Sequence, residues 1–433
     1  MKKVINTAIF AAIIAGAAVT AQAADIQVDM YGASAQRDYW KDLGQTFMTK
    51  TVAQGGMGCV SAHQASFKKN NVVDKNKIVI KGETCTIAGG DDVYITYNAV
   101  ASLEGVRAAK EVAPVVAEAC ATSNGNAFRT VVKVDSCTYP AWPTVGVCSA
   151  TVCSDIELGT SDVEGSSFDQ ESHGDIYGHM GTGTVVDIIL AAETVTGLKN
   201  YKPTVVPFAF YANNDLGGAT PPPDAPPADP ITRNLTRTQA LNLFSGSVYD
   251  WGQLAGFGAY EGKGVQLCFR HAGSGTHATI DKAVMRGDMS LVKDEAVNGL
   301  PGTLTDAFFY QSSDSSSGGM KQCIETNGGH GLHVNGGEYI AIGYLDADAL
   351  DTTAMHQMKY QGASATDTEI ANGSYDFWSA QNVYLKTSDD SAVVQKMMAF
   401  AAANIPTAKD GIWVKANDLK VQKLTDTSIP VLQ

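Results

Sequence analysis

The chain has 433 residues, with 45 acidic against 31 basic side chains and a formal net charge of −14 at pH 7. So acidic a surface argues against binding to nucleic acid or to anionic membranes. It leaves room for a small anionic ligand, because local N–H and O–H dipoles can outweigh a distant net charge. The length exceeds what one hydrophobic core usually organises, so two or more domains are expected.

The first 23 residues have the pattern of a secretory signal peptide. Lys2 and Lys3 precede a short apolar run, and small residues follow it up to Ala21-Gln22-Ala23. The apolar run is short for a membrane span, and no cysteine at the cleavage point would take a lipid anchor. We expect cleavage after Ala23 and a mature protein in the periplasm or outside the cell, with no membrane insertion.

Eight cysteines follow the predicted cleavage point, at positions 59, 85, 120, 137, 148, 153, 268 and 323. An even number in an exported protein favours disulfides over metal thiolates, although connectivity cannot be read from spacing alone. The Cys148 and Cys153 spacing has no partner that would complete a zinc site. Because Cys268 and Cys323 flank the core of the predicted second domain, we expect them to pair. The segment 120–153 holds four of the cysteines and is predicted to be a disulfide-rich excursion.

The mature chain begins with a strand, a short turn and a helix, as an α/β unit does. Ile26–Tyr31 alternates like a half-buried strand, Gly32-Ala33-Ser34-Ala35 turns, and an amphipathic helix runs through Tyr39, Trp40, Leu43 and Phe47. Further strands are predicted at 77–80, 93–97, 204–211 and 265–269, and helices at 105–118, 184–194, 237–244 and 390–402. This interleaving predicts open α/β sheets. The Pro-rich stretch 221–230 is expected to be an extended surface loop.

The strongest candidate for chemistry is the segment Arg270 to Thr276, which follows the strand 265–269 and precedes a helix-like run. Its glycines allow the N–H groups of Ser274, Gly275 and Thr276 to converge at a helix N-terminus, which favours an anion. Arg270 can add two parallel hydrogen bonds to the oxygens of a tetrahedral ion. Taken alone, the same residues would also make an ordinary helix cap.

Four segments, in order, resemble motifs of the periplasmic phosphate-binding proteins of ABC importers. They are Leu235-Thr236 with Phe244 to Trp251, then Arg270 to Thr276, then Ile342-Gly343-Tyr344, and finally Asn372-Gly373-Ser374-Tyr375-Asp376-Phe377-Trp378. The resemblance implies the type II periplasmic-binding fold, with two open α/β domains joined by hinge strands and a ligand cleft between them. It implies domain I over 24–205 and 350–433, and domain II over 206–349. The hinges would lie at Val205–Tyr211 and Tyr344–Leu350.

The same resemblance nominates residues for the ligand site. The turn 32–35 implies contacts from the Ser34 hydroxyl and the Ala35 N–H, the turn 101–105 implies Ser102, and the turn 159–162 implies Asp162. From the residues alone, Ser34 and Ser102 would serve equally well as helix caps, and Asp162 as part of a surface Asx-turn. The predicted ligand residues are Ser34, Ala35, Ser102, Asp162, Arg270, Ser274, Gly275 and Thr276.

An acidic residue in an oxyanion site has a specific chemical meaning. A carboxylate such as Asp162 is favourable there only when the ligand still carries a proton to donate, as hydrogenphosphate does and sulfate does not. An unpaired buried acceptor costs about 1–3 kcal/mol, so Asp162 would discriminate between two ions of nearly equal size.

Three positions depart from the family pattern, and one of them is Ala35, which replaces an aromatic residue in the first turn. Ala272 stands where the family has an acidic residue that holds the arginine, so another carboxylate would have to orient Arg270 or the side chain would be looser. Leu103 replaces a glycine and would resist a positive φ. These departures favour a different oxyanion, or weaker binding.

The resulting prediction is a monomeric, exported solute-binding protein that takes up phosphate or a related oxyanion for an ABC permease. No cofactor is predicted. His271, His277, His330 and His333 lack the partners of a metal site, and Ser274 lacks the surroundings of a hydrolase nucleophile. Two alternatives stay open: a secreted structural, adhesive or redox-associated protein of the same fold, and an enzyme acting on phosphate esters.

Overall fold

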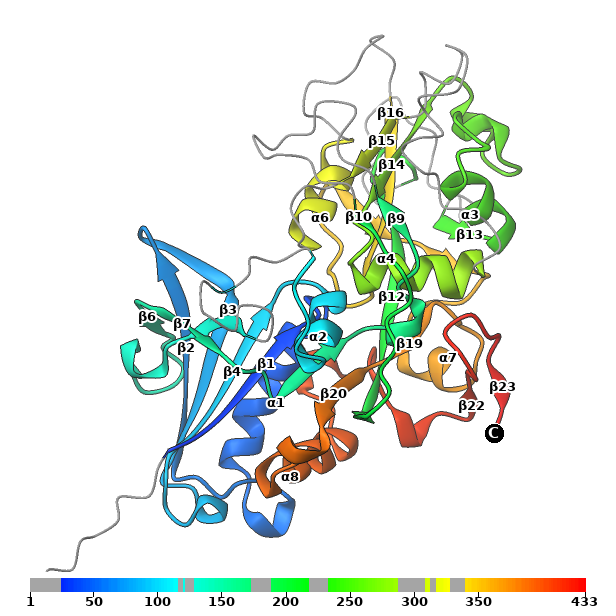
Figure 1. Cartoon of the computed structure of the whole chain (residues 1–433). Helices are drawn as coiled ribbons and strands as arrows, with labels where there is room; N and C mark the ends of the chain where they lie inside the picture. Colours follow the sequence, from blue (N-terminus) through cyan, green and yellow to red (C-terminus); the bar gives the residue numbers. More distant parts are fainter. Residues whose placement is uncertain are drawn as a thin grey trace, which may run out of the picture.

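The computed structural model describes residues 25–115, 120, 128–172, 188–217, 233–286, 308–311, 317–327 and 339–433. The predicted signal peptide, the Pro-rich loop 221–230 and the pair His330 and His333 lie outside these residues. Two large sheets organise the described part, and they lie towards opposite ends of the molecule with α2 and α4 between them (Figure 1). The predicted α/β class with two open sheets is confirmed.

The first sheet has eight strands in a mixed arrangement. In spatial order they are β11 (Leu198–Tyr201), β20 (Asn382–Lys386), β8 (Leu158–Ser161), β1 (Ile26–Gly32), β4 (Val93–Ala99), β3 (Val72–Glu83), β2 (Ser61–Lys69) and β6 (Gly146–Cys148). The three central strands β8, β1 and β4 run parallel. β3 and β20 run antiparallel to them, and β2, which pairs antiparallel with β3, runs in the direction of the central strands. Because carboxyl ends of parallel strands meet at one edge, the loops after β1, β4 and β8 gather in one place.

The second sheet is built from later parts of the chain. Its order is β15 (Phe308–Gln311), β14 (Gly264–Phe269), β16 (Tyr339–Asp346), β12 (Thr204–Asn213) and β17 (Met355–Gln357). β14 and β16 are parallel, with Leu267 opposite Ile342. The first residues of β12 instead pair with β19 (Trp378–Ala380) and β21 (Val414–Lys415). This one strand therefore begins beside β19 and β21 and continues into the second sheet. The predicted domain boundaries at residues 205 and 349 stay predictions.

Seven α-helices lie in the described part of the chain, and those expected after residue 36, at 237–244 and at 390–402 are among them. They are α1 (Arg37–Thr49), α2 (Ser102–Ala109), α3 (Arg237–Phe244), α4 (Gly275–Thr279), α6 (Ser317–Glu325), α7 (Asp367–Ala371) and α8 (Ala392–Ala403), and a π-helical turn over Ile280–Met285 extends α4. The apolar side of α1 faces β3 and α8, and the rings of Phe47 and Phe400 meet at 5.4 Å. No helix in the described part is long and apolar enough to cross a membrane.

The remaining elements are short strand pairs and single turns. The pairs are β5 (Arg129–Val132) with β7 (Thr151–Ser154), β9 (Glu171–Ser172) with β10 (Ile188–Ile189), β13 (Asn234–Leu235) with β18 (Lys359–Tyr360), and β22 (Val421–Gln422) with β23 (Val431–Leu432).

Two predicted helices are wrong. The helix predicted at 105–118 begins earlier, at Ser102, and ends at Ala109, because Glu111 takes a left-handed backbone with φ of +56° and Pro114 cannot continue the hydrogen-bond ladder. In the segment 184–194, the described residues contain strand β10 and no helix. Here the β-branched Ile188 and Ile189 form strand pairs with Glu171 and Ser172.

Four disulfides join the eight cysteines. They link Cys59 to Cys85, Cys120 to Cys153, Cys137 to Cys148, and Cys268 to Cys323. The predicted pairing of Cys268 with Cys323 is confirmed, and it ties β14 to α6 in the second sheet's core. Two of the other bridges lie within 120–153, so this excursion is closed on itself as its composition predicts.

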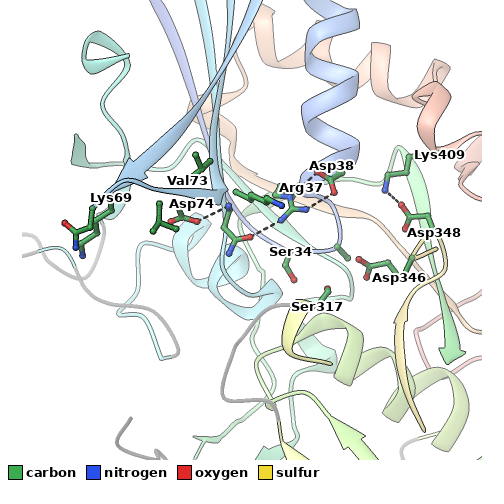
Figure 2. Close-up of a pocket in the computed structure, with 17 residues that line it drawn as sticks. Ser34, Arg37, Asp38, Lys69, Val73, Asp74, Ser317, Asp346, Asp348 and Lys409 are labelled. Atoms are coloured by element: carbon green, nitrogen blue, oxygen red, sulfur yellow. Dashed lines mark hydrogen bonds and ion pairs between the residues drawn. The ribbon is translucent and has the colours of Figure 1, made fainter. Parts of the chain in front are cut away.

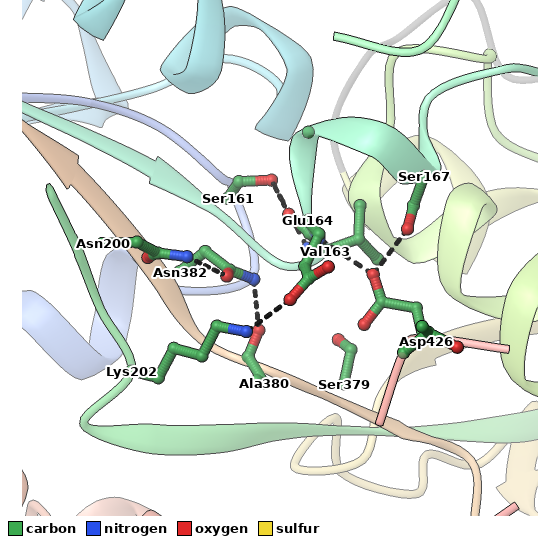
Figure 3. A network of polar contacts seen from close by, with 12 residues as sticks. Ser161, Val163, Glu164, Ser167, Asn200, Lys202, Ser379, Ala380, Asn382 and Asp426 are labelled. Atoms are coloured by element: carbon green, nitrogen blue, oxygen red, sulfur yellow. Dashed lines mark hydrogen bonds and ion pairs between the residues drawn. The ribbon is translucent and has the colours of Figure 1, made fainter. Parts of the chain in front are cut away.

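The end of the chain, here called the C-terminal strap (residues 421–428), touches both halves of the molecule. Asp426 accepts hydrogen bonds from the Ser167 hydroxyl (2.6 Å) and the Glu164 N–H (2.9 Å) in the loop after β8, as Figure 3 shows. On the other side, the Thr427 carbonyl accepts from Arg286, which follows the π-helical turn (3.1 Å). The half-buried Lys423 donates to the carbonyls of Asp376 and Trp378 at the start of β19.

Candidate functional site

The predicted ligand residues lie on loops that meet where the two sheets approach each other. Ser34 and Ala35 follow β1, Ser102 opens α2 after β4, and Asp162 follows β8. From the second sheet, Arg270 follows β14, and residues 274–276 open α4. The parallel register of β1, β4 and β8 brings the first group to one edge, which is the usual place for a ligand in an open α/β sheet.

Asp162 is the centre of a buried hydrogen-bond cluster. Its side chain is buried, with a residue exposure of 1%. One carboxyl oxygen accepts from the Ser102 hydroxyl at 2.8 Å, and the other accepts from the Gln36 amide at 3.0 Å. The reading of Asp162 as part of a surface turn is therefore wrong. Both carboxyl oxygens therefore have donors within the protein.

Gly275 brings the second sheet onto this cluster. A Cβ atom built on Gly275 would lie 2.2 Å from the Ser102 hydroxyl oxygen and 2.7 Å from the Asp162 Cβ, closer than any side chain could sit. The Leu103 N–H donates to the Gly273 carbonyl at 3.2 Å beside it. The structure thus brings Ser102, Asp162 and Gly275 together from opposite sides.

Ser274, Ser102 and Ser34 differ in whether they cap a helix. Ser274 is the N-cap of α4 and accepts from the His277 N–H at 3.4 Å. It therefore acts as the helix cap that its position in the sequence also allows. Ser102 caps nothing and donates to Asp162 instead. Ser34 makes no cap either, because the cap position of α1 belongs to Gln36.

Arg270 is almost fully buried, with 1% of its surface exposed. Its N–H donates to the Tyr344 hydroxyl at 3.1 Å, and its guanidinium Nη1 reaches the Ser317 hydroxyl at 3.4 Å. Ala272 supplies no carboxylate, but the Arg270 charge acts on two others, lowering the pKa of both Asp162 and Asp346 against the larger effect of burial. Asp346, the last residue of β16, is therefore an acidic neighbour that the family pattern does not anticipate.

A cavity of about 790 Å³ opens beside this buried group. Ser34, Ala35, Ser317 and Asp346 line its inner end, and the hairpin residues 69–76 line its outer end (Figure 2). Of the predicted ligand residues, Ser34 and Ala35 face the cavity. The other six lie behind its wall, buried in the contact between the two sheets.

Leu103, which replaces a glycine of the family pattern, causes no backbone strain in this structure. Leu103 lies in the first turn of α2 with no positive φ, and its side chain is buried against Val106, Phe168 and Tyr384. Its N–H forms the contact with Gly273 described above. The expected resistance to a positive φ does not arise.

The histidines of the motif are structural within the described residues. His271 accepts from the Gly273 N–H at 3.1 Å, and His277 shares a hydrogen bond of 2.7 Å with the Tyr344 hydroxyl. Burial, with the charge of Arg270, lowers the pKa of each to about 3, so both are neutral near pH 7. The described part of the chain holds no group of three or more His, Cys, Asp or Glu side chains placed for a metal ion.

Three residues of the site escape sequence reasoning. They are Gln36, which holds Asp162; Ser317, which meets Arg270; and Asp346, which lines the cavity. Gln36 follows the predicted turn 32–35 directly, and Asp346 lies two residues after the Gly343-Tyr344 motif. A search outward from the motifs would have found both, while Ser317 depends on the packing of α6 beside β16.

The ionisation of Asp162 predicts a dependence of stability on pH. Burial, with the charge of Asp346, raises the pKa of Asp162 from 3.8 to about 7. The folded protein then holds a proton that the unfolded chain has released, so the free energy of unfolding falls as pH rises from about 4 to about 7. Without ligand, wild type should lose roughly 3 kcal/mol more than Asp162→Asn between pH 5 and pH 8.

Urea unfolding of both proteins at the two pH values measures this difference. Other buried carboxyls, such as Glu157, titrate in both proteins and cancel in the comparison. Equal losses in the two proteins would show that Asp162 is already ionised across this range.

No family model matches the sequence. Similar solved structures include one described as a phosphate ABC transporter substrate-binding protein from Clostridium perfringens with bound phosphate (15% identity, 86% of this chain and 92% of that one, TM-score 0.44). An ABC-type phosphate transport receptor from Vibrio cholerae (12% identity, 87% and 93%, TM-score 0.42) and a DING protein (10% identity, 87% and 93%, TM-score 0.40) also match. The first two are the kind of protein that the sequence motifs resemble.

Proposed function

We propose that this chain is an exported solute-binding protein that binds phosphate, or an oxyanion of the same shape, between its two sheets for an ABC permease. The observation that carries the proposal is the buried arginine. Arg270 comes from the second sheet and lies within the electrostatic reach of Asp162, whose hydrogen-bond partners come from the first. A cation and an acceptor held together out of water form a site that suits a protonated anion.

Closure would follow from the same arrangement. Donors from β1 and α2 lie on one side, and Arg270 with the turn 274–276 lies on the other. A ligand that touches both sides favours the state in which they meet, since only there does it collect all its contacts. A permease would then recognise that state.

Selectivity tests the proposal directly. By isothermal titration calorimetry at pH 8 on protein stripped of ligand, where Asp162 with its pKa of about 7 is mostly ionised, we expect phosphate and arsenate to bind. Sulfate should bind roughly 10- to 100-fold more weakly, because it leaves Asp162 without a proton to accept. Asp162→Asn should narrow this ratio, since an amide can also donate. Absence of heat with all three oxyanions would overturn the proposal.

One observation favours the alternative of a secreted protein that has kept the fold without tight binding. Both oxygens of Asp162 already have donors within the protein, and Gly275 packs directly against them. A ligand that needs Asp162 must displace one of these bonds. The same titration decides between the two functions, because a self-satisfied site gives no heat.

A further inference from the structure

The cavity is larger than the ion proposed for the site. Its volume of about 790 Å³ lies within the range of roughly 300–1,000 Å³ that accommodates whole organic ligands. The buried oxyanion residues lie behind its inner end, which Ser34, Ala35 and Ser317 line. The surplus space runs from Ser34 and Ser317 out to the hairpin residues 69–76 (Figure 2). The geometry therefore leaves room for a group attached to the oxyanion.

Among the carboxylates that line the cavity, one has an oxygen atom without a hydrogen-bond donor. Four carboxylates line the cavity, and three are ion-paired: Asp38 with Arg37 at 2.8 Å, Asp74 with Lys77 at 2.8 Å, and Asp348 with Lys409. Among the described residues the Asp346 side chain has no hydrogen-bonded or ion-paired partner, and its Oδ1 atom is fully buried. A buried acceptor without a donor is costly, so it marks a place where a ligand group would be stabilised.

Asp346 lies next to the oxyanion site. Arg270 follows the carboxyl end of β14, and Asp346 is the last residue of its parallel neighbour β16, so both lie at the same edge of the second sheet. Ser317, which meets the Arg270 guanidinium, lines the cavity beside it. A ligand whose oxyanion contacts Arg270 would thus place its next atoms near the Asp346 carboxylate.

The chemistry of the walls indicates what those atoms are. The positive charges of Lys409, Arg270 and Arg37 already act on Asp346, together with the negative charge of Asp38, so the carboxyl group needs a hydrogen-bond donor more than a further cation. Asn70, Asn76, Lys75 and Ser317 add further polar atoms, and no aromatic ring is present in the described lining. Such walls suit hydroxyl groups better than a nucleobase.

We propose that the natural ligand is a small polyhydroxylated phosphate monoester, of the glycerol phosphate or sugar phosphate class, with a hydroxyl group donating to Asp346. This proposal rests on the oxyanion site described under the proposed function. It replaces inorganic phosphate by a phosphate that carries an organic group in the adjoining cavity.

Calorimetric titration with inorganic phosphate, glycerol 3-phosphate and glucose 6-phosphate tests the proposal. We expect at least one ester to bind about tenfold or more tightly than phosphate, as one hydrogen bond to a charged acceptor would give. Asp346→Ala should bring the ratio of ester to phosphate affinity close to one. Asp346→Asn, which keeps an acceptor, should retain part of the preference.

Asp38→Ala is the matched control, because it removes a cavity carboxylate that already has a cationic partner. The ratio of ester to phosphate affinity in Asp38→Ala should stay near that of wild type. Phosphate binding without any preference for an ester, or equal loss of the preference in both alanine variants, would overturn this inference and leave the proposed function standing. No binding of phosphate or of either ester would overturn both.

Discussion

Arg270→Ala should weaken oxyanion binding by at least about 100-fold. The positive charge of the guanidinium acts on both Asp162 and Asp346, and its removal takes away charge-assisted hydrogen bonds worth roughly 1.5–3 kcal/mol each while leaving the carboxylates to repel the ligand. Calorimetry with the tightest ligand measures the loss. The oxyanion affinity of Arg270→Lys should lie between those of wild type and Arg270→Ala, because an ammonium group keeps the charge and loses the planar arrangement of donors.

Arg233→Ala serves as the control for removal of an arginine. Its guanidinium donates to the Gly217 carbonyl, and it does not line the cavity. This variant should bind as wild type does. Retention of wild-type affinity in a folded Arg270→Ala protein would place the oxyanion elsewhere.

The second large effect is expected from Gly275→Ala. The new methyl group would lie 2.2 Å from the Ser102 hydroxyl oxygen and 2.7 Å from Asp162, so the two sides of the site could not meet as they do here. Overpacking of this kind costs roughly 1–3 kcal/mol, which corresponds to about a 10- to 100-fold loss of affinity. Small-angle scattering of Gly275→Ala should show a more extended molecule than wild type. Calorimetric titration should show the loss of oxyanion affinity.

Gly258→Ala is the matched control, since a Cβ atom at that position meets nothing within 4 Å and Gly258 has no positive φ. It should change neither the scattering nor the affinity. Unchanged binding and shape in Gly275→Ala would mean that the ligand does not need the contact between the sheets.

Much of the fold could be predicted because the signals were local. The alternation at 26–31, the stripe through Tyr39 and Phe47, and the run 390–402 each specify one element with a buried face, and β1, α1 and α8 lie where expected. The segments 105–118 and 184–194 failed because helix propensity was weighed without the left-handed residue and the strand partner that decided them.

Some residues of the candidate site could likewise be predicted from a local motif, and others could not. Arg270, Ser274 and Gly275 stand in one continuous motif, and the strand before it makes their location predictable. Gln36 and Asp346 carry no motif, because their importance arises from contacts between segments over a hundred residues apart, such as the bond from Gln36 to Asp162. The parallel pairing of β14 with β16, which brings Arg270 and Asp346 to the same edge of the second sheet, is a property of the folded sheet alone.

The C-terminal strap bears on how quickly a bound ligand would leave. Asp426 is bonded to the loop after β8, and Thr427 is bonded to Arg286 beneath the second sheet, so the two sheets cannot separate at this point without breaking one of these attachments. The lifetime of a complex is set by the barrier to opening, and residues at the very end of the chain contribute to that barrier without touching the ligand. Residence time and affinity can therefore be tuned by separate parts of the sequence.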